Sequence, residues 1–87
     1  MSYEIIIQSK AEKQLSKLPE KALLAIDRAI TALVETPRPA SCKKMKGYEN
    51  YYRLRVGSYR IIYSVSDGLL QVVVIKVGHR KDIYSGL

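Results

Sequence analysis

Three arginines recur at strand-like spacing in the second half of this 87-residue chain. Arg53 and Arg55 alternate with apolar residues in the segment 49–56, and Arg60 lies between apolar neighbours in the segment 59–65. Because successive side chains of a strand point to opposite faces, we expect the three guanidinium groups on one face and the apolar side chains on the other. Charges of one sign repel one another at this spacing unless an anion lies among them. The pattern therefore predicts an anion-binding face.

Further basic residues are expected at the edge of this face. Arg80 follows the last predicted strand and lies between His79 and Lys81. The lysines that we expect to contact the same ligand, in addition to Lys81, are Lys43, Lys44, Lys46 and Lys76.

The charge is divided unevenly along the chain. Residues 1–37 contain five basic and five acidic residues, whereas residues 38–87 contain ten basic and three acidic ones, so the formal net charge of +7 lies entirely in the second part. Glu49 is the only acid in the segment 38–66, so ion pairs within that segment cannot neutralise it. This asymmetry indicates a polyanionic partner, first nucleic acid and second an acidic protein segment. A membrane surface is disfavoured because the amphipathic helix has mixed charges on its polar face.

Tyrosines accompany the basic residues. Six of the seven lie in the basic part of the chain, namely Tyr48, Tyr51, Tyr52, Tyr59, Tyr63 and Tyr84. Aromatic rings beside cations are typical of proteins that stack unpaired bases. Tyr59 and Tyr63 fit the alternative role of filling the core, whereas Tyr84 lies in a polar tail where its ring is available to a ligand.

Other chemistries fit the sequence poorly. One histidine and one cysteine do not make a zinc site, no glycine-rich phosphate loop is present, and the few carboxylates are badly placed for two-metal catalysis. The sequence therefore predicts a reaction without metal or cofactor. The single cysteine, Cys42, excludes an internal disulfide, and no signal peptide or membrane span is recognisable. We therefore expect a cytoplasmic protein.

The expected elements give an α+β fold in the order β-α-α-β-β-β, formed by one domain over residues 1–87. A β-branched strand over 3–8 precedes a helix that begins near Lys10, with Ser9 and Glu12 as a capping box. That helix ends before Pro19, which suits the first turn of a second helix. The second helix carries an apolar stripe at three- and four-residue spacing, made by Ala22, Leu23, Ile26, Ala29, Ile30, Leu33 and Val34.

The second half is expected to be a loop and a β-meander. Residues 37–47 are predicted as a loop, followed by strands over 49–56, 59–65 and 69–77, with turns at Gly57-Ser58 and Asp67-Gly68 and a tail over 78–87. The helices should form a hairpin that packs on one face of an antiparallel sheet. The other face, with the arginines, is then left open.

Several motifs of this chain resemble those of the RelE/ParE superfamily, and of the RelE-type toxins in particular. They are Tyr52-Arg53-Leu54-Arg55-Val56, Gly57-Ser58-Tyr59-Arg60-Ile61-Ile62-Tyr63, Val77-Gly78-His79-Arg80 and Asp82-Ile83-Tyr84, with Leu15-X-X-Leu18-Pro19, Pro37 and Lys46-Gly47 upstream. The resemblance covers nearly the whole chain. It implies the toxin of a type II toxin–antitoxin system, a ribosome-dependent endoribonuclease that cleaves mRNA in the A site, contacts ribosomal RNA and is blocked by a cognate antitoxin in a hetero-oligomer.

The resemblance also implies roles for individual residues. Arg60 would hold the scissile phosphate, Arg80 would stabilise or protonate the leaving oxygen, and Tyr84 would orient or stack on the nucleotide. Arg53 and Arg55 stand where some members have lysines. The four arginines would together stabilise the charge of the transition state, while the ribosome holds the RNA bent for in-line attack.

Because arginine occupies these two positions, the identity of the general base is left open. A lysine there is a candidate base for the 2′-hydroxyl, but a guanidinium stays protonated in proteins. The remaining candidates are His79, one of the lysines in the cluster Lys43-Lys44-Lys46, and Glu49.

Three alternatives remain open at this point. A ParE-like inhibitor of DNA gyrase would share the fold without being a nuclease. A nucleic-acid-binding module without catalysis would bind in a salt-dependent way and release no cleaved product. An inactive remnant would use its basic face only for an acidic antitoxin segment that folds on binding.

Overall fold

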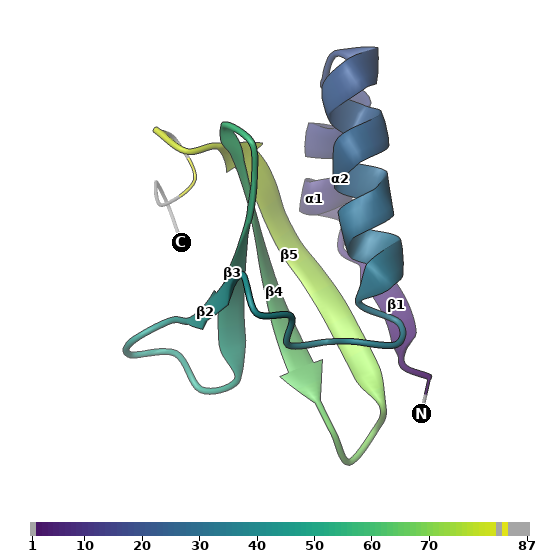
Figure 1. Ribbon diagram of the computed structural model, residues 1–87, viewed down its shortest axis with the longest axis vertical. Coiled ribbons are helices and arrows are strands. Elements are labelled where there is room, and N and C mark those ends of the chain that lie inside the picture. The colour runs from purple at the N-terminus through teal and green to yellow at the C-terminus, as the bar shows by residue number, and fades with distance from the viewer. Residues whose placement is uncertain (1, 82, 84–87) are drawn as a thin grey trace.

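A computed structural model of the chain shows two helices on one face of a five-stranded sheet (Figure 1). The structure describes residues 2–81 and 83. The elements are β1 (Glu4–Ile7), α1 (Ser9–Ser16), α2 (Glu20–Ala32), β2 (Cys42–Lys44), β3 (Tyr51–Val56), β4 (Tyr59–Ser66) and β5 (Gln71–His79). No helix within these residues is long and apolar enough to cross a membrane.

The sheet has the strand order β1-β5-β4-β3-β2 and is mixed. β3, β4 and β5 form the expected antiparallel meander, and the tight turns lie where the sequence predicts them. The prediction of a wholly antiparallel sheet was wrong, because β1 pairs in parallel with β5. No hairpin turn joins these two strands, so no local signal fixes their relative direction.

The segment 37–47 was wrongly predicted as a loop throughout. Residues 42–44 form β2, which pairs antiparallel with β3 and makes the edge of the sheet. β2 has only three residues and no apolar alternation, so its pairing with β3 is the only feature that identifies it as a strand. The pairing sets Lys43 directly opposite Arg53.

The helix boundaries differ slightly from the prediction. Ser9 is the first residue of α1 rather than its cap, and no side chain caps either helix start, so the predicted capping box was wrong. Gln8 is the N-cap, in an extended conformation that continues from β1, and its carbonyl accepts the N–H of Glu12 at 2.9 Å. Pro19 is the N-cap of α2 rather than a residue of its first turn.

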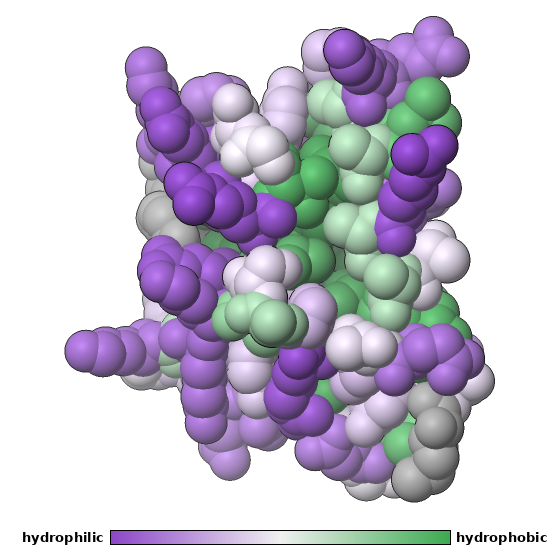
Figure 2. All heavy atoms as spheres, in the orientation of Figure 1, coloured by the Kyte–Doolittle hydropathy of each residue, from purple (hydrophilic) through white to green (hydrophobic). Residues whose placement is uncertain are grey.

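The core lies between the helices and the inner face of the sheet. Ile26, Ile30 and Leu33 from the predicted stripe of α2 are buried there, while its other members are only partly buried. The sheet contributes the alternating apolar residues Tyr52, Leu54, Ile61, Tyr63, Val65, Val72, Val74 and Val77. Figure 2 shows hydrophobic residues gathered between the sheet and the helices, and hydrophilic residues on the other side of the sheet. The helices therefore leave uncovered the outer face of β3 and the end of β4 that carries Arg60, whereas Ile62 farther along the outer face of β4 is fully buried.

A bulge in β5 changes which side chains reach this outer face. Ile62 pairs with Lys76 and its neighbour Tyr63 pairs with Val74, so Ile75 is an extra residue in β5. Strict alternation would place Lys76 on the same face as the buried Val74. The extra residue instead sets Lys76 on the outer face, in one row with Ile62 and Arg53.

The Arg38 side chain is held in place by Asp67 and Tyr52. Its guanidinium donates two hydrogen bonds to the Asp67 carboxylate, at 3.1 and 2.9 Å, and one to the Tyr52 hydroxyl at 2.9 Å. Asp67 also accepts the Tyr3 hydroxyl at 2.7 Å. These bonds tie the segment before β2 to the turn between β4 and β5. They also neutralise one of the cations that the sequence leaves without an acid nearby.

Replacement Asp67→Asn is expected to lower the melting temperature at neutral pH. Hydrogen bonds from Arg38, and then from Tyr3, hold the pKa of the Asp67 carboxyl below its ordinary value of 3.8. A carboxyl with a lowered folded-state pKa stabilises the fold above its unfolded-state pKa, and this contribution is lost as the pH falls through the folded-state value. Thermal unfolding followed by circular dichroism should therefore show a difference between wild type and variant at pH 7 that disappears in strong acid. The exposed Asp27→Asn on α2 is the control, and a difference that is the same at every pH would contradict this account.

Candidate active site

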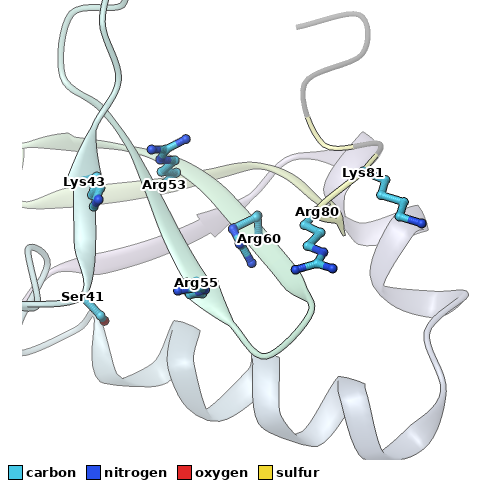
Figure 3. A pocket seen from close by; sticks show the side chains of 7 residues that line it. All are labelled: Ser41, Lys43, Arg53, Arg55, Arg60, Arg80 and Lys81. Atoms are coloured by element: carbon cyan, nitrogen blue, oxygen red, sulfur yellow. The ribbon is translucent and has the colours of Figure 1, made fainter.

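An open groove of about 690 Å³ lies on the outer face of the sheet (Figure 3). The residues that line it are Ser41, Lys43, Arg53, Arg55, Arg60, Arg80 and Lys81. Six of these seven are basic. The groove therefore combines a dense positive charge with access from solvent, as a phosphate of a large ligand requires.

The sheet register brings the arginines together. Arg55 on β3 is directly opposite Arg60 on β4. Directly opposed residues in an antiparallel pair have Cβ atoms about 5 Å apart, and like charges in this position destabilise the sheet. Arg53 lies two residues from Arg55 on the same face and opposite Ile62. The structure thus places several guanidinium groups side by side, at a cost that a bound anion would offset.

Arg60 is held in position by backbone carbonyls. Its Nη1 donates to the carbonyl oxygen of Tyr59 at 2.9 Å and to that of Gly57 at 3.4 Å. Gly57 adopts a φ of 59° in the turn between β3 and β4, which is a conformation that glycine tolerates. A guanidinium has five N–H donors, so these bonds orient the group and leave donors for an anion.

Arg80 is fixed to the same turn through its main chain. Its N–H donates to the carbonyl oxygen of Ser58 at 2.9 Å. Gly78, two residues earlier on β5, is the register partner of Arg60. Arg80 therefore reaches the end of the groove beside Arg60 (Figure 3), where Lys81 also lies at the margin.

His79 is not brought to the groove. It pairs in register with Tyr59, and the two rings meet edge-on with their centroids 5.8 Å apart. Tyr59 packs against the core, on the side of β4 opposite to Arg60. The alternation of β5 therefore turns the imidazole away from the arginines, although His79 immediately precedes Arg80 in the sequence.

The predicted lysines are distributed over three environments. Lys43 lines the groove, and Lys44 and Lys46 line adjoining hollows at the tip of the hairpin formed by β2 and β3. Lys76 faces the same side but is only 5% exposed, so a ligand does not reach it directly. Tyr84 lies outside the described residues. Ser41 is a lining residue that the sequence analysis missed, and its position follows only from the path of the chain into β2.

None of the described residues that line the groove is an acid. Arg38, which forms an ion pair with Asp67 at 2.9 Å, lies outside the groove. Within residues 2–81 and 83, no three His, Cys, Asp or Glu side chains gather closely enough to hold a metal ion. The positive charge available to a ligand is therefore that of the lysine and arginine side chains themselves.

Comparison with known proteins places the chain in one family. Residues 5–84 match the family model described as the ParE toxin of the type II toxin–antitoxin system parDE. The chain is 31% identical to toxin RelG of Mycobacterium tuberculosis over 97% of its own length and 98% of that protein. It is 29% identical to the mRNA interferase toxin RelE of Escherichia coli, over 98% of its own length and 93% of that protein.

Solved structures give the same result for the fold. The archaeal RelE–RelB complex from Pyrococcus horikoshii contains a chain that superposes with a TM-score of 0.82 at 28% identity, over 92% of this chain and 97% of that one. The fold, the family model and the relatives agree. The chain therefore belongs to the RelE/ParE superfamily of toxins of type II toxin–antitoxin systems.

Proposed function

We propose that this toxin is a metal-independent endoribonuclease that cleaves mRNA in the ribosomal A site and thereby stops translation. The observation that carries the proposal is the convergence of Arg53, Arg55, Arg60 and Arg80 on one groove. A relative over nearly the whole chain is named an mRNA interferase toxin, which supports the same activity. The reaction would take place in the cytoplasm, on translating ribosomes.

In the proposed reaction the 2′-oxygen of one nucleotide attacks the adjacent phosphorus. The new bond between the 2′-oxygen and phosphorus forms as the bond to the 5′-oxygen breaks, which leaves a cyclic phosphate and a free 5′-hydroxyl. Arg60, fixed by two carbonyl oxygens, is placed to bind the non-bridging oxygens, and Arg80 to stabilise or protonate the leaving oxygen. Preorganised charge of this kind acts on the negative charge that grows in the transition state.

The proton of the 2′-hydroxyl must pass to a base. Of the candidates from the sequence, Lys43 lines the groove, whereas His79, Lys44, Lys46 and Glu49 do not. Lys43 is opposite Arg53 in the register of β2 and β3, which sets it beside the proposed phosphate site. We therefore assign the base to Lys43, which can accept the proton only as its neutral amine, with the ribosome holding the RNA in line for the attack.

A cognate antitoxin is the second proposed partner. A solved relative is a complex of RelE with RelB, and this chain superposes on its toxin over almost its full length. An antitoxin segment that covered the groove would bring carboxylates to its arginines and lysines. We propose that this protein is held inactive in such a toxin–antitoxin hetero-oligomer.

The proposed function is tested by mapping new 5′ ends after induction of the protein in bacteria. One message is expressed in a translated copy and in a copy without a start codon. Cuts are expected only in the translated copy and are expected to disappear in Arg80→Ala. Cuts in both copies would show that the ribosome is not required.

Inhibition of DNA gyrase is the second candidate, because the matching family model bears the ParE name. It predicts growth arrest with intact messages and with broken chromosomal DNA. That outcome, with unchanged toxicity of Arg80→Ala, would replace the nuclease proposal.

A further inference from the structure

Two tyrosines form an exposed stack at the tip of the hairpin made by β2 and β3. The rings of Tyr48 and Tyr51 lie 5.4 Å apart between centroids, with 18° between their planes. Tyr48 is 40% exposed. An aromatic pair in the core would lose nearly all of its exposure, as the Tyr52–Tyr63 pair does. The exposed pair therefore presents an aromatic surface to a ligand.

The backbone holds this hairpin tip in a defined shape. The N–H of Met45 donates to the carbonyl oxygen of Tyr51 at 2.9 Å, which closes the loop that contains Tyr48. Gly47 and Asn50 have φ angles of 81° and 62°, and such left-handed residues make the loop turn sharply. The carbonyl of Asn50 also accepts the N–H of Val65 on β4 at 3.1 Å. The stacked rings are thus attached to the sheet, and their position relative to the groove is fixed.

The stack continues the row of arginines along β3. Tyr51, Arg53 and Arg55 occupy alternate positions and so share the outer face, because Tyr52 and Leu54 are in the core. Tyr51 and Arg55 are four positions apart on the strand, a separation of about 14 Å at roughly 3.4 Å per residue. An extended single strand of RNA crosses this length in a few nucleotides.

Lysines fill the space between the groove and the stack. A hollow of about 420 Å³, lined by Lys43, Lys44, Met45, Lys46 and Arg53, shares Lys43 and Arg53 with the main groove. The next hollow, of about 460 Å³, is lined by Lys44, Lys46, Tyr48 and Glu49 among others. A positively charged track therefore leads from Arg60 to the tyrosines, and Glu49 is the acid among the described residues that line it.

We propose that Tyr48 and Tyr51 form a stacking site for one base of single-stranded RNA, a few nucleotides from the phosphate held by Arg60. The inference rests on the proposed nuclease function and adds a second contact to the same message. Aromatic stacking combined with a cationic groove is a general way to hold single strands, because every base has a flat face. An acidic protein segment is the competing occupant. RNA is favoured because an aromatic face in line with a groove of arginines and lysines suits a base together with its phosphates.

The stacking site is tested with a short single-stranded RNA that carries one 2-aminopurine, placed at successive positions in otherwise identical molecules. A 2′-O-methyl group at the expected cut prevents cleavage. With wild type, fluorescence is expected to be quenched at one position, where the base stacks on Tyr48. Tyr48→Ala is expected to abolish this quenching and to weaken binding by roughly fivefold to a hundredfold. Tyr48→Phe keeps the ring and is expected to retain both.

Two further variants make the test specific. Leu69→Ala removes an exposed apolar side chain that is 70% accessible in the turn between β4 and β5, and is expected to leave binding unchanged. Glu49→Gln removes the acid beside the stack and is expected to tighten binding at low salt. Opposite effects of neighbouring substitutions at Tyr48 and Glu49 cannot arise from a general loss of structure.

The result separates this inference from the proposed nuclease. Equal quenching and affinity in wild type and Tyr48→Ala would overturn the stacking site, even if the ribosome assay shows cleavage. The stacking site would also be overturned if Tyr48→Ala binds RNA normally but loses affinity for a glutamate-rich peptide, because the occupant would then be a protein. Loss of quenching in Tyr48→Ala, with no cleavage by wild type on ribosomes, would support the stacking site and refute the nuclease.

Discussion

Replacement Arg60→Ala is expected to slow cleavage of ribosome-bound message by about a hundredfold to a thousandfold. Removal of a single preorganised donor from a site of developing charge has effects of this size. Arg60 is the arginine whose guanidinium is fixed by carbonyl oxygens of its own turn, so its loss removes a group that needs no reorganisation during the reaction. The measurement is the single-turnover rate on purified ribosomes that carry a defined message in the A site.

The same variant is expected to remain folded. Arg60 is directly opposite Arg55, and removal of one of two opposed like charges relieves a repulsion. The free energy of unfolding in urea should therefore stay within about 1 kcal/mol of wild type. Loss of activity without loss of stability is the signature of a residue whose charge serves the ligand rather than the fold.

Arg28→Ala is the matched control for this experiment. Arg28 is exposed on α2, on the face of the sheet that carries the helices, and its removal changes the net charge by the same amount. It is expected to cleave at the wild-type rate. Equal slowing by both substitutions would mean that overall charge, rather than the groove, determines activity. Full activity of Arg60→Ala would remove Arg60 from the mechanism.

Replacement Ile61→Ala is expected to lower the free energy of unfolding by about 2–5 kcal/mol, which is the largest change in stability predicted here for a single substitution. Ile61 has no exposed surface and lies in the main core cluster, opposite Leu54 on β3 and Val77 on β5. Truncation removes buried methyl groups and leaves a cavity that the flanking strands cannot close. In a domain of this length, each kcal/mol lowers the melting temperature by about 4–8 °C.

Urea denaturation measures this effect, and Ile6→Ala is the control. Ile6 is 37% exposed on the edge strand β1, so its truncation should cost much less. Similar losses in the two variants would show that Ile61 is not closely packed. Because Ile61 adjoins Arg60 on β4, we also expect Ile61→Ala to lower activity at temperatures where it is still folded.

Much of the fold follows from local patterns in the sequence. Alternation with a period of two identified β3 and β4, and the three- and four-residue spacing identified the buried side of α2. The turn at Asp67-Gly68 indicated β5, which begins and ends two residues later than the predicted 69–77. The predicted turns are short and contain glycine, so their positions depend on few residues. These features are local, because each is set by neighbours within a few positions along the chain.

The errors in the sheet concern segments without such a pattern. β2 is too short to show alternation, and it becomes a strand because β3 offers it hydrogen bonds. The direction of β1 beside β5 and the extra residue at Ile75 also depend on pairing between distant segments. The alternation of a single strand contains no information on its partner.

In the candidate site, too, some features follow from local patterns and others from pairing between distant segments. By itself the sequence determined the concentration of charge, which follows from its composition. It also determined the common face of Arg53, Arg55 and Arg60, because strand alternation and the two-residue turn between the strands fix which side chains share a face. Only the tertiary structure decided that Lys43 lies beside Arg53, that Arg80 joins the groove through Ser58, and that His79 turns toward Tyr59 instead. Each of these depends on which backbone groups pair across the sheet, and that pairing is chosen by the packing of the whole core rather than by neighbouring residues.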